Sequence, residues 1–308
     1  MKTPSLHMGR TEWVMLLLLS CFWGGSFFFF KILTTALPPF TIVLGRVGIA
    51  ALALNLYLIA RRDFMPSSLA LWRSFLVMGI LNNVIPFTLI VFGETRIDSG
   101  LASILNASTP VFAILSAHML TQNEKLSWNK GLGVAFGFAG VTLLIGPEAL
   151  KGLANADLYG ELACLLGALT YGFAGIYGRR FKGLAPIKIA TGQITASTLF
   201  MLPLTALVDR PWTLPMPEPH IWAALLGIAL VCTALAYMLF FRILGAAGAT
   251  NVQLVTFLVP ISALILGWLF LGEHLALNAL IGMAMIGLGL MCIDGRLLPK
   301  RTGQVSGK

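Results

Sequence analysis

Residues 98–146 read DSGLASILNASTPVFAILSAHMLTQNEKLSWNKGLGVAFGFAGVTLLIG, and this stretch decides how the chain folds. An apolar segment interrupted by Pro110 is followed by a short polar turn and then by a second apolar segment that is rich in glycine. The same plan returns in residues 248–295, GATNVQLVTFLVPISALILGWLFLGEHLALNALIGMAMIGLGLMCIDG, with Pro260 in the place of Pro110. A repeated, proline-interrupted helix hairpin of this kind predicts a duplicated membrane protein.

The composition excludes a water-soluble globule. Of 308 residues, 57% are hydrophobic and 11% are charged, whereas soluble proteins carry about 25% charged residues. The bilayer must therefore act as the solvent for most of the chain. The basic residues behind the net charge of +9 are spread along the chain, which argues against a nucleic-acid partner. The four cysteines lie inside apolar segments without metal-ligand spacing and are interpreted as small core residues.

Ten apolar runs have the length expected of membrane-spanning helices. The first run lacks a following small-residue cleavage site and is interpreted as an uncleaved span. The predicted spans are Glu12–Leu33, Pro39–Ala60, Leu71–Phe92, Ser99–Leu120, Lys130–Ile145, Leu158–Tyr177, Pro186–Val208, His220–Phe241, Ala249–Leu271 and Leu275–Ile293.

The distribution of lysine and arginine predicts the orientation. Sixteen basic residues fall on the side of the N-terminus and four on the other side. Because cytoplasmic segments carry the excess of positive charge, both termini are predicted to be cytoplasmic, with the protein in the cell (inner) membrane. The segments on the opposite side carry Lys31, Arg96, Lys151 and Arg210.

Two five-span halves predict an inverted repeat. Matching positions include Trp23–Gly24 with Tyr171–Gly172 and Gly45 with Gly192. Because each half has an odd number of spans, the second half enters the membrane from the opposite side. Inverted repeats are typical of secondary transporters, which bind substrate at the midplane between the halves. The predicted domains are a tail (1–11), a first repeat (12–147), an outer linker (148–157), a second repeat (158–295) and a C-terminal tail (296–308).

The chain resembles the drug/metabolite transporter superfamily, and within it the EamA-type carriers. The resemblance rests on Trp23-Gly24-Gly25-Ser26, on Arg46 early in the second span, on Pro110 with Glu124, and on Pro260 with Leu271-Gly272-Glu273. It covers residues 10–295. It implies a ten-helix carrier with cytoplasmic termini and a cavity lined by spans 1, 3, 4, 6, 8 and 9. The members that this chain most resembles export amino acids.

Polar residues beside the two matched prolines are candidates for the substrate cavity. A proline frees a backbone carbonyl, which lipid does not tolerate, so these helix faces are expected to point inward; the alternative is a structural kink relieved by a nearby hydroxyl. Spacings of three and four residues place each set on one helix face. The sets are Asn106, Thr109 and Pro110 in the fourth span, and Gln253, Thr256 and Pro260 in the ninth.

Further cavity candidates come from four other spans. Amides and aromatic rings near the midplane suit a zwitterionic or amphipathic solute, although they can also serve only as helix–helix hydrogen bonds. The candidates are Asn82, Asn83 and Thr88 in the third span, Thr233 and Tyr237 in the eighth, and Trp23 and Tyr171 in the first and sixth.

Three charged residues are predicted to act in structure or gating. Arg46 lies well inside a span, where a charge suggests a function. It could attract a substrate carboxylate, but the neutral Gln193 at its repeat position favours a structural role, paired with a nearby acid or a helix carbonyl. Glu124 and Glu273 lie in tight turns, where each can accept hydrogen bonds from the start of a helix.

No set of catalytic residues, metal cluster or cofactor motif is visible in the sequence. The protein is therefore predicted not to be an enzyme. The leading hypothesis is a secondary transporter for small amphipathic metabolites, with apolar or aromatic amino acids as the main candidates, that exports them or lets them pass by alternating access. The alternatives are a drug or cation exporter, for which no central carboxylate is apparent, and an intramembrane enzyme. The predicted partners are a small-molecule substrate and the lipid bilayer.

Overall fold

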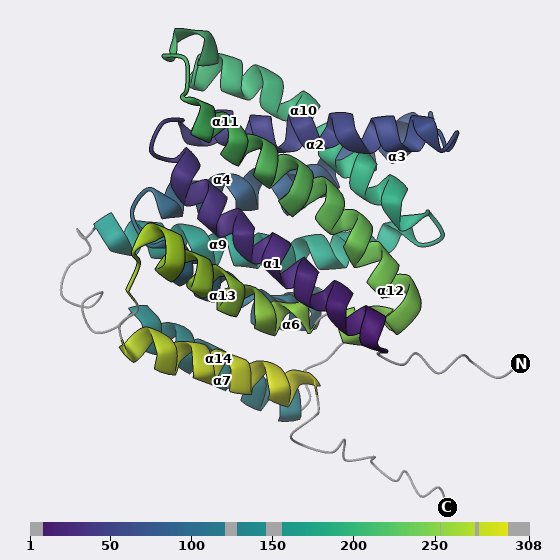
Figure 1. The fold of residues 1–308 in the computed structure, drawn as a ribbon. Helices are drawn as coiled ribbons and strands as arrows, with labels where there is room; N and C mark the ends of the chain where they lie inside the picture. The colour runs from purple at the N-terminus through teal and green to yellow at the C-terminus, as the bar shows by residue number, and fades with distance from the viewer. Residues whose placement is uncertain (1–8, 121–127, 146–155, 253, 275–276, 295–308) are drawn as a thin grey trace, which may run out of the picture.

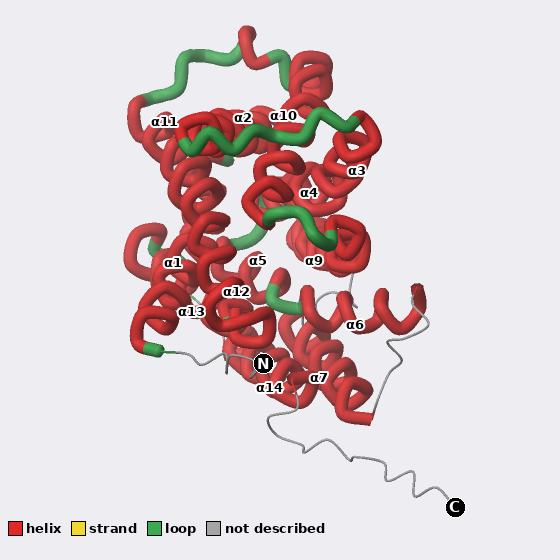
Figure 2. The backbone as a smooth tube through the Cα atoms, turned by 90° about the vertical axis from the view of Figure 1, so that its right-hand side faces the viewer, coloured by secondary structure: helices red, strands yellow, loops and turns green. Residues whose placement is uncertain are grey.

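The computed structural model describes residues 9–120, 128–145, 156–252, 254–274 and 277–294, and all regular elements in these ranges are helical (Figure 1, Figure 2). Seven helices are long and apolar enough to cross a membrane, and three shorter apolar helices bring the number in the described ranges to ten. The protein is therefore an all-α, multi-pass membrane protein.

The first five spans are built from seven α-helices and one π-helical turn. They are α1 (Arg10–Leu33), α2 (Pro39–Ala60), the continuous unit α3 (Leu69–Gly79), η1 (Ile80–Val84) and α4 (Ile85–Glu94), the broken unit α5 (Ser99–Asn106) and α6 (Thr109–Leu120), and α7 (Trp128–Ile145).

The second five spans follow the same plan. They are α9 (Ala156–Tyr177) with the 3₁₀ turn η2 (Gly178–Phe181), α10 (Pro186–Val208), and, after the short turn η3 (Pro211–Thr213), the unit α11 (Pro219–Leu226), η4 (Gly227–Leu235) and α12 (Ala236–Val252). The last two are α13 (Val255–Leu266) with η5 (Gly267–Leu271), and α14 (Leu277–Asp294).

Proline and π-helical turns shape these helices at matched places. Pro39, Pro186 and Pro219 stand in the first turn of their helices, where a missing N–H costs no hydrogen bond. Pro86 is the second residue of α4, just after η1, and the wider π turn compensates for the hydrogen bond that proline cannot donate. A second π turn, η4, occurs at the equivalent place in the other half. Such turns are common at functional sites.

Corresponding helices of the two halves make corresponding contacts. α2 packs on α10, and α7 packs on α14, so these two pairs join like helices of the two halves (Figure 1). Between them, α1 packs on α13 as α9 packs on α6, and η4 packs on α1 as α4 packs on α9. These contacts of the first half thus have counterparts in the second, as expected of a two-fold relation between repeats.

Glycines allow the closest of these crossings. A Cβ atom at Gly24 would lie 2.7 Å from Ser262 Cβ and 2.9 Å from Ala263 N on α13, and one at Gly172 would lie 3.0 Å from Ala113 N on α6. Gly24 and Gly172 are repeat mates. Small residues bring helix backbones together in membranes, where van der Waals packing drives association.

The two ends of the bundle differ in charge. One end, called the basic end, contains residues 61–68 and 178–185, including Arg61, Arg62, Arg179, Arg180 and Lys182. The start of α1 and the end of α14 lie at this end (Figure 1). The other end, called the opposite end, contains residues 34–38, 95–98, 209–218 and 272–274.

The structure corrects the predicted course of several spans. The third span runs to Glu94 rather than Phe92, and the fourth is broken at residues 107–108 rather than continuous. The eighth does not end at Phe241: α12 continues to Val252, so the ninth begins at Val255. The predicted span ended just before the exposed Arg242, but Ile243 beside it is fully buried, and this packing continues the helix.

Two glycines on α14 test the crossing with α7. A Cβ at Gly289 would lie 2.6 Å from Gly133 O, whereas one at Gly287 meets nothing within 4 Å. We expect Gly289→Ala to lower the free energy of unfolding by about 1–3 kcal/mol through overpacking. Gly287→Ala should leave it unchanged or raise it by up to ~1 kcal/mol. Melting temperatures in detergent measure both, and equal values for the two variants would contradict this packing.

Candidate functional site

A central cavity of about 630 Å³ lies between the two halves, within the range of small-molecule sites, roughly 300–1,000 Å³. Helices from both repeats form its wall, chiefly α1, η1, α4, α5, α9, α12 and α13. Eight of the residues predicted for the cavity line it: Trp23, Asn82, Asn106, Thr109, Tyr171, Tyr237, Thr256 and Pro260.

The other predicted cavity residues lie elsewhere. Asn83 is fully buried against α10, where its Nδ2 donates to Ser197 Oγ at 3.1 Å. Thr88 and Pro110 are outside the cavity wall, and Thr233 stands behind Arg46. Gln253 lies outside the described residues. Direct contact of any of these residues with a substrate stays a prediction.

A network of polar side chains crosses from one half to the other. Asn82 Nδ2 on η1 donates to Gln193 Oε1 on α10 at 3.2 Å and to the Tyr237 hydroxyl on α12 at 3.3 Å. All three residues line the cavity. Because η1 widens the helix at this point, Asn82 faces the cavity while the adjacent Asn83 faces α10. Gln193, the repeat mate of Arg46, was not predicted as a site residue.

Arg46 is the one charged residue among the described residues that line the cavity. Its Nε donates to Thr233 Oγ1 at 2.9 Å, and its Nη2 donates to Ser26 Oγ at 3.3 Å. Its guanidinium carbon lies 3.8 Å from the ring centre of Phe87 and 5.0 Å from that of Phe30. In the described part of the chain, no carboxylate forms an ion pair with it.

This environment fixes the arginine but leaves its charge unneutralised. A planar guanidinium stacks well on aromatic faces. A charge removed from water is normally paired. The neutral hydroxyls of Ser26 and Thr233 orient the fork without supplying a counter-charge, and the side chain is 5% exposed. The arrangement is suited to binding an anionic group in the cavity.

Aromatic rings form another part of the wall. The ring centres of Trp23 and Phe240 are 5.5 Å apart, and those of Tyr237 and Phe241 are 6.0 Å apart. Each of these four residues lines the cavity. They provide an apolar surface with hydroxyl and indole groups at its edge, as an amphipathic ligand requires.

The carbonyl freed by Pro110 already has a partner. Thr109 Oγ1 donates to Asn106 O at 2.7 Å, so this carbonyl is satisfied within the broken unit. By contrast, Asn106 Oδ1 is buried in the cavity wall with no donor. A buried acceptor without a donor is costly, so a ligand N–H is the group that would stabilise it.

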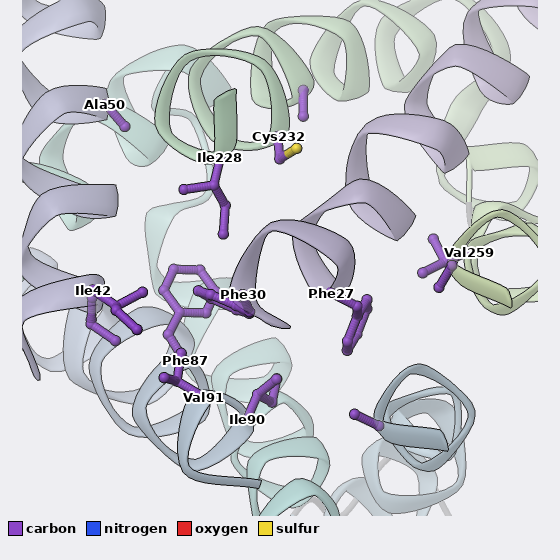
Figure 3. Close-up of a cluster of buried hydrophobic side chains, with 14 of the residues drawn as sticks. Phe27, Phe30, Ile42, Ala50, Phe87, Ile90, Val91, Ile228, Cys232 and Val259 are labelled. Atoms are coloured by element: carbon purple, nitrogen blue, oxygen red, sulfur yellow. The ribbon is translucent and has the colours of Figure 1, made fainter. Parts of the chain in front are cut away.

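The cavity wall is less buried near the basic end than toward the opposite end. Near the basic end the lining residues Met78, Gly178, Ile189 and Leu244 are half-buried. Toward the opposite end Phe30, Phe87 and Ile90 are 1%, 5% and 3% exposed, and Figure 3 shows them packed together on α1 and α4.

Two charged residues form hydrogen bonds between segments at the opposite end. Lys31 Nζ on α1 donates to the carbonyls of Glu94 and Ile97 at 3.2 and 2.8 Å. Glu273 accepts hydrogen bonds from Ser99 N, Ser99 Oγ and Gly100 N at 2.8, 2.9 and 3.0 Å, which cap the start of α5. Glu124, the repeat mate of Glu273, lies outside the described residues.

The burial of Glu94 was not predicted from the sequence. The third span was predicted to end at Phe92, and Glu94 was one possible partner of Arg46, but the structure extends the helix to include Glu94 and buries it fully. The signal available in the sequence was its position directly after Gly93, which packs against Gly160 O and Cys164 Sγ on α9. In the described ranges, no group of three or more His, Cys, Asp or Glu side chains could hold a metal ion.

The hydroxyl behind Arg46 provides a test of this geometry. Thr233→Val keeps the shape of the side chain but leaves the buried Arg46 Nε without an acceptor. We expect the free energy of unfolding to fall by about 1–3 kcal/mol. Thr198→Val is the matched control. The Thr198 hydroxyl, like that of Thr233, donates to a backbone carbonyl of its own helix, but it is not bonded to Arg46. We expect this control to change the free energy of unfolding by no more than about 0.5 kcal/mol. Equal thermal shifts in the two variants would show that Thr233 does not support Arg46.

Comparisons with known proteins agree with the division of the chain into two repeats. The model of the EamA-like transporter family matches twice, over residues 11–146 and 158–293. The uncharacterized transporter YoaV of Bacillus subtilis is 25% identical over 269 residues, covering 87% of this chain and 91% of its own. Protein PecM of Dickeya dadantii is 27% identical over 291 residues, with 92% and 93% covered.

Two further comparisons extend the picture. The uncharacterized inner membrane transporter YedA of Escherichia coli K12 is 25% identical over 261 residues, covering 82% of this chain and 81% of its own. A solved structure described only as the crystal structure of a protein superposes with a TM-score of 0.62 over 91% of this chain and 95% of that chain, at 18% identity. The latter shows a shared fold.

Proposed function

Because this chain belongs to the EamA-like transporter family and is thus a membrane transporter, we propose that it carries amino acids with apolar or aromatic side chains. The observation that carries this proposal is the unpaired Arg46 in a cavity whose other surfaces are aromatic and amide groups. A zwitterion with an apolar side chain matches these surfaces, and a cationic drug would be repelled by the guanidinium.

The substrate has a defined orientation in this proposal. Its carboxylate binds Arg46, whose charge no described protein group neutralises. Its ammonium group donates to Asn106 Oδ1, which has no donor in the structure. Its side chain packs on the rings of Trp23 and Phe240. The ligand would then satisfy the two unsatisfied groups of the cavity wall, the Arg46 charge and the Asn106 Oδ1 acceptor.

The paired contacts of the two halves support a mechanism of alternating access. The cavity wall is less buried at the basic end than at the opposite end, so in this proposal the basic end is the open one. Exchanging the conformations of the two repeats would close the first and open the second, with little change inside either half. If the basic end faces the cytoplasm, as the positive-inside rule indicates, this state loads substrate from the cytoplasm and the direction of transport is export.

Uptake of labelled amino acids into proteoliposomes tests the proposal. In the wild type, a free apolar amino acid should compete at least tenfold better than its amide, because only the former offers a carboxylate to Arg46. Arg46→Gln should bring that ratio close to one, and Arg46→Lys should give an intermediate value, since lysine lacks the bidentate fork.

The matched control is Arg73→Gln, which removes an exposed arginine and should leave the ratio unchanged. A lower melting temperature for Arg46→Gln with an unaltered ratio would establish the structural role that the sequence favoured. Absence of uptake across the whole amino-acid panel would overturn the substrate class.

A further inference from the structure

Glu94 is a fully buried acid without a partner for its carboxyl group. It ends α4, and its side chain is 0% exposed. Neither Oε1 nor Oε2 has a hydrogen-bond donor, and among the described residues no lysine or arginine forms an ion pair with it. The C-terminal end of a helix also disfavours negative charge.

The nearby cations are already engaged elsewhere. Lys31 on α1 directs its ammonium group to the backbone carbonyls of Glu94 and Ile97, and it lies 4.0 Å from Asp98 Oδ1. Arg46 on α2 is held by Ser26 and Thr233. Neither cation therefore supplies a hydrogen bond to the Glu94 side chain.

The remaining neighbours are acids or apolar groups. Glu273 keeps its carboxylate on the start of α5, one helix away from Glu94. α9, which packs along α4, brings the carboxyl of Glu161 and the thiol of Cys164 to the same region. An ionised Glu94 would thus be buried without donors and near other acids.

A carboxylate in such a place binds a proton instead. Removing an ionised carboxylate from water without hydrogen bonds is far more costly than removing the neutral acid. The closed conformation of the opposite end, in which Glu94 is fully buried, therefore favours the neutral carboxylic acid of Glu94 over its carboxylate.

The position of Glu94 ties this proton to the transport cycle. Phe87 and Ile90 on the same helix line the cavity, and Glu94 lies one turn farther toward the opposite end. There it borders a depression shared with Lys31 and Glu273, the two residues that hold this end closed. Opening of the end would bring water to the carboxyl group.

We propose that Glu94 is a proton-binding site of the transport cycle, which takes up a proton from the water at the opposite end when that end closes and returns it there when the end opens. This inference rests on the proposed alternation between two states. The step is a simple acid–base exchange: the carboxylate gains a proton from water on closure, and the O–H bond breaks again on opening.

The proposal fixes the sign of the pH dependence. The closed state holds one proton more than the open state, so raising the pH favours opening of the opposite end. Above the range where Glu94 ionises in the open state, the ratio of open to closed molecules should rise by up to about tenfold per pH unit. An uncharged glutamine should keep the end closed at every pH.

Infrared spectroscopy tests the bound proton directly, without transport. The wild-type protein in detergent at neutral pH should show the carbonyl band of a buried, protonated carboxylic acid. That band should be lost in Glu94→Gln and kept in Glu218→Gln, which changes an exposed acid at the same end. A wild-type spectrum without the band would overturn the proposal, whatever the substrate proves to be.

Distances between spin labels at the exposed residues Lys182 and Arg242 report the state of the basic end. In the wild type and in Glu218→Gln, the population in which this end is closed should grow as the pH is raised. In Glu94→Gln it should stay small throughout. A Glu94→Gln protein with the wild-type pH response would contradict the proposal. A single distance in every sample, with the infrared band present, would refute the alternation and leave the proton site established.

Discussion

The close crossing of α1 with α13, and of α9 with α6, is the contact on which the rest of the structure depends. Gly24 and Gly172 allow the backbones of these helices to come into contact with the neighbouring helix. In lipid, the hydrophobic effect does not drive helices together, so close van der Waals packing must do so. The residues just before them, Trp23 and Tyr171, face the cavity. Helix packing and the binding surface are therefore set by the same two points.

The two halves have similar helix contacts, but the two ends of the bundle differ in how their helices are joined. At the opposite end Lys31 and Glu273 join helices that come from different parts of the chain. At the basic end the cavity wall stays half-buried. Because the helix contacts of one half are repeated in the other, the reverse arrangement uses the same kinds of interface. The protein can then change state by breaking a few polar contacts at one end and forming others at the other end, without repacking its core.

The fold could be predicted from the sequence repeat, because matching prolines and glycines can be recognised in the sequence alone. The sequence also predicted eight residues of the cavity wall, since polar residues on one face of a lipid-embedded helix must face protein or water. It could not separate Asn82 from Asn83, because a π turn decides which of them faces the cavity. It missed the burial of Glu94, which arises from packing between α4 and α9, far apart in the chain.

The central claim is that one cavity opens at either end in turn. Two pairs of spin labels test it most directly: Lys182 with Arg242 across the basic end, and Thr35 with Thr95, the matched exposed positions of the first repeat, across the opposite end. In proteoliposomes, adding a transported amino acid should change the two distances in opposite directions, one shortening as the other lengthens. Distances that both stay constant, or that lengthen together, while transport proceeds would contradict the account.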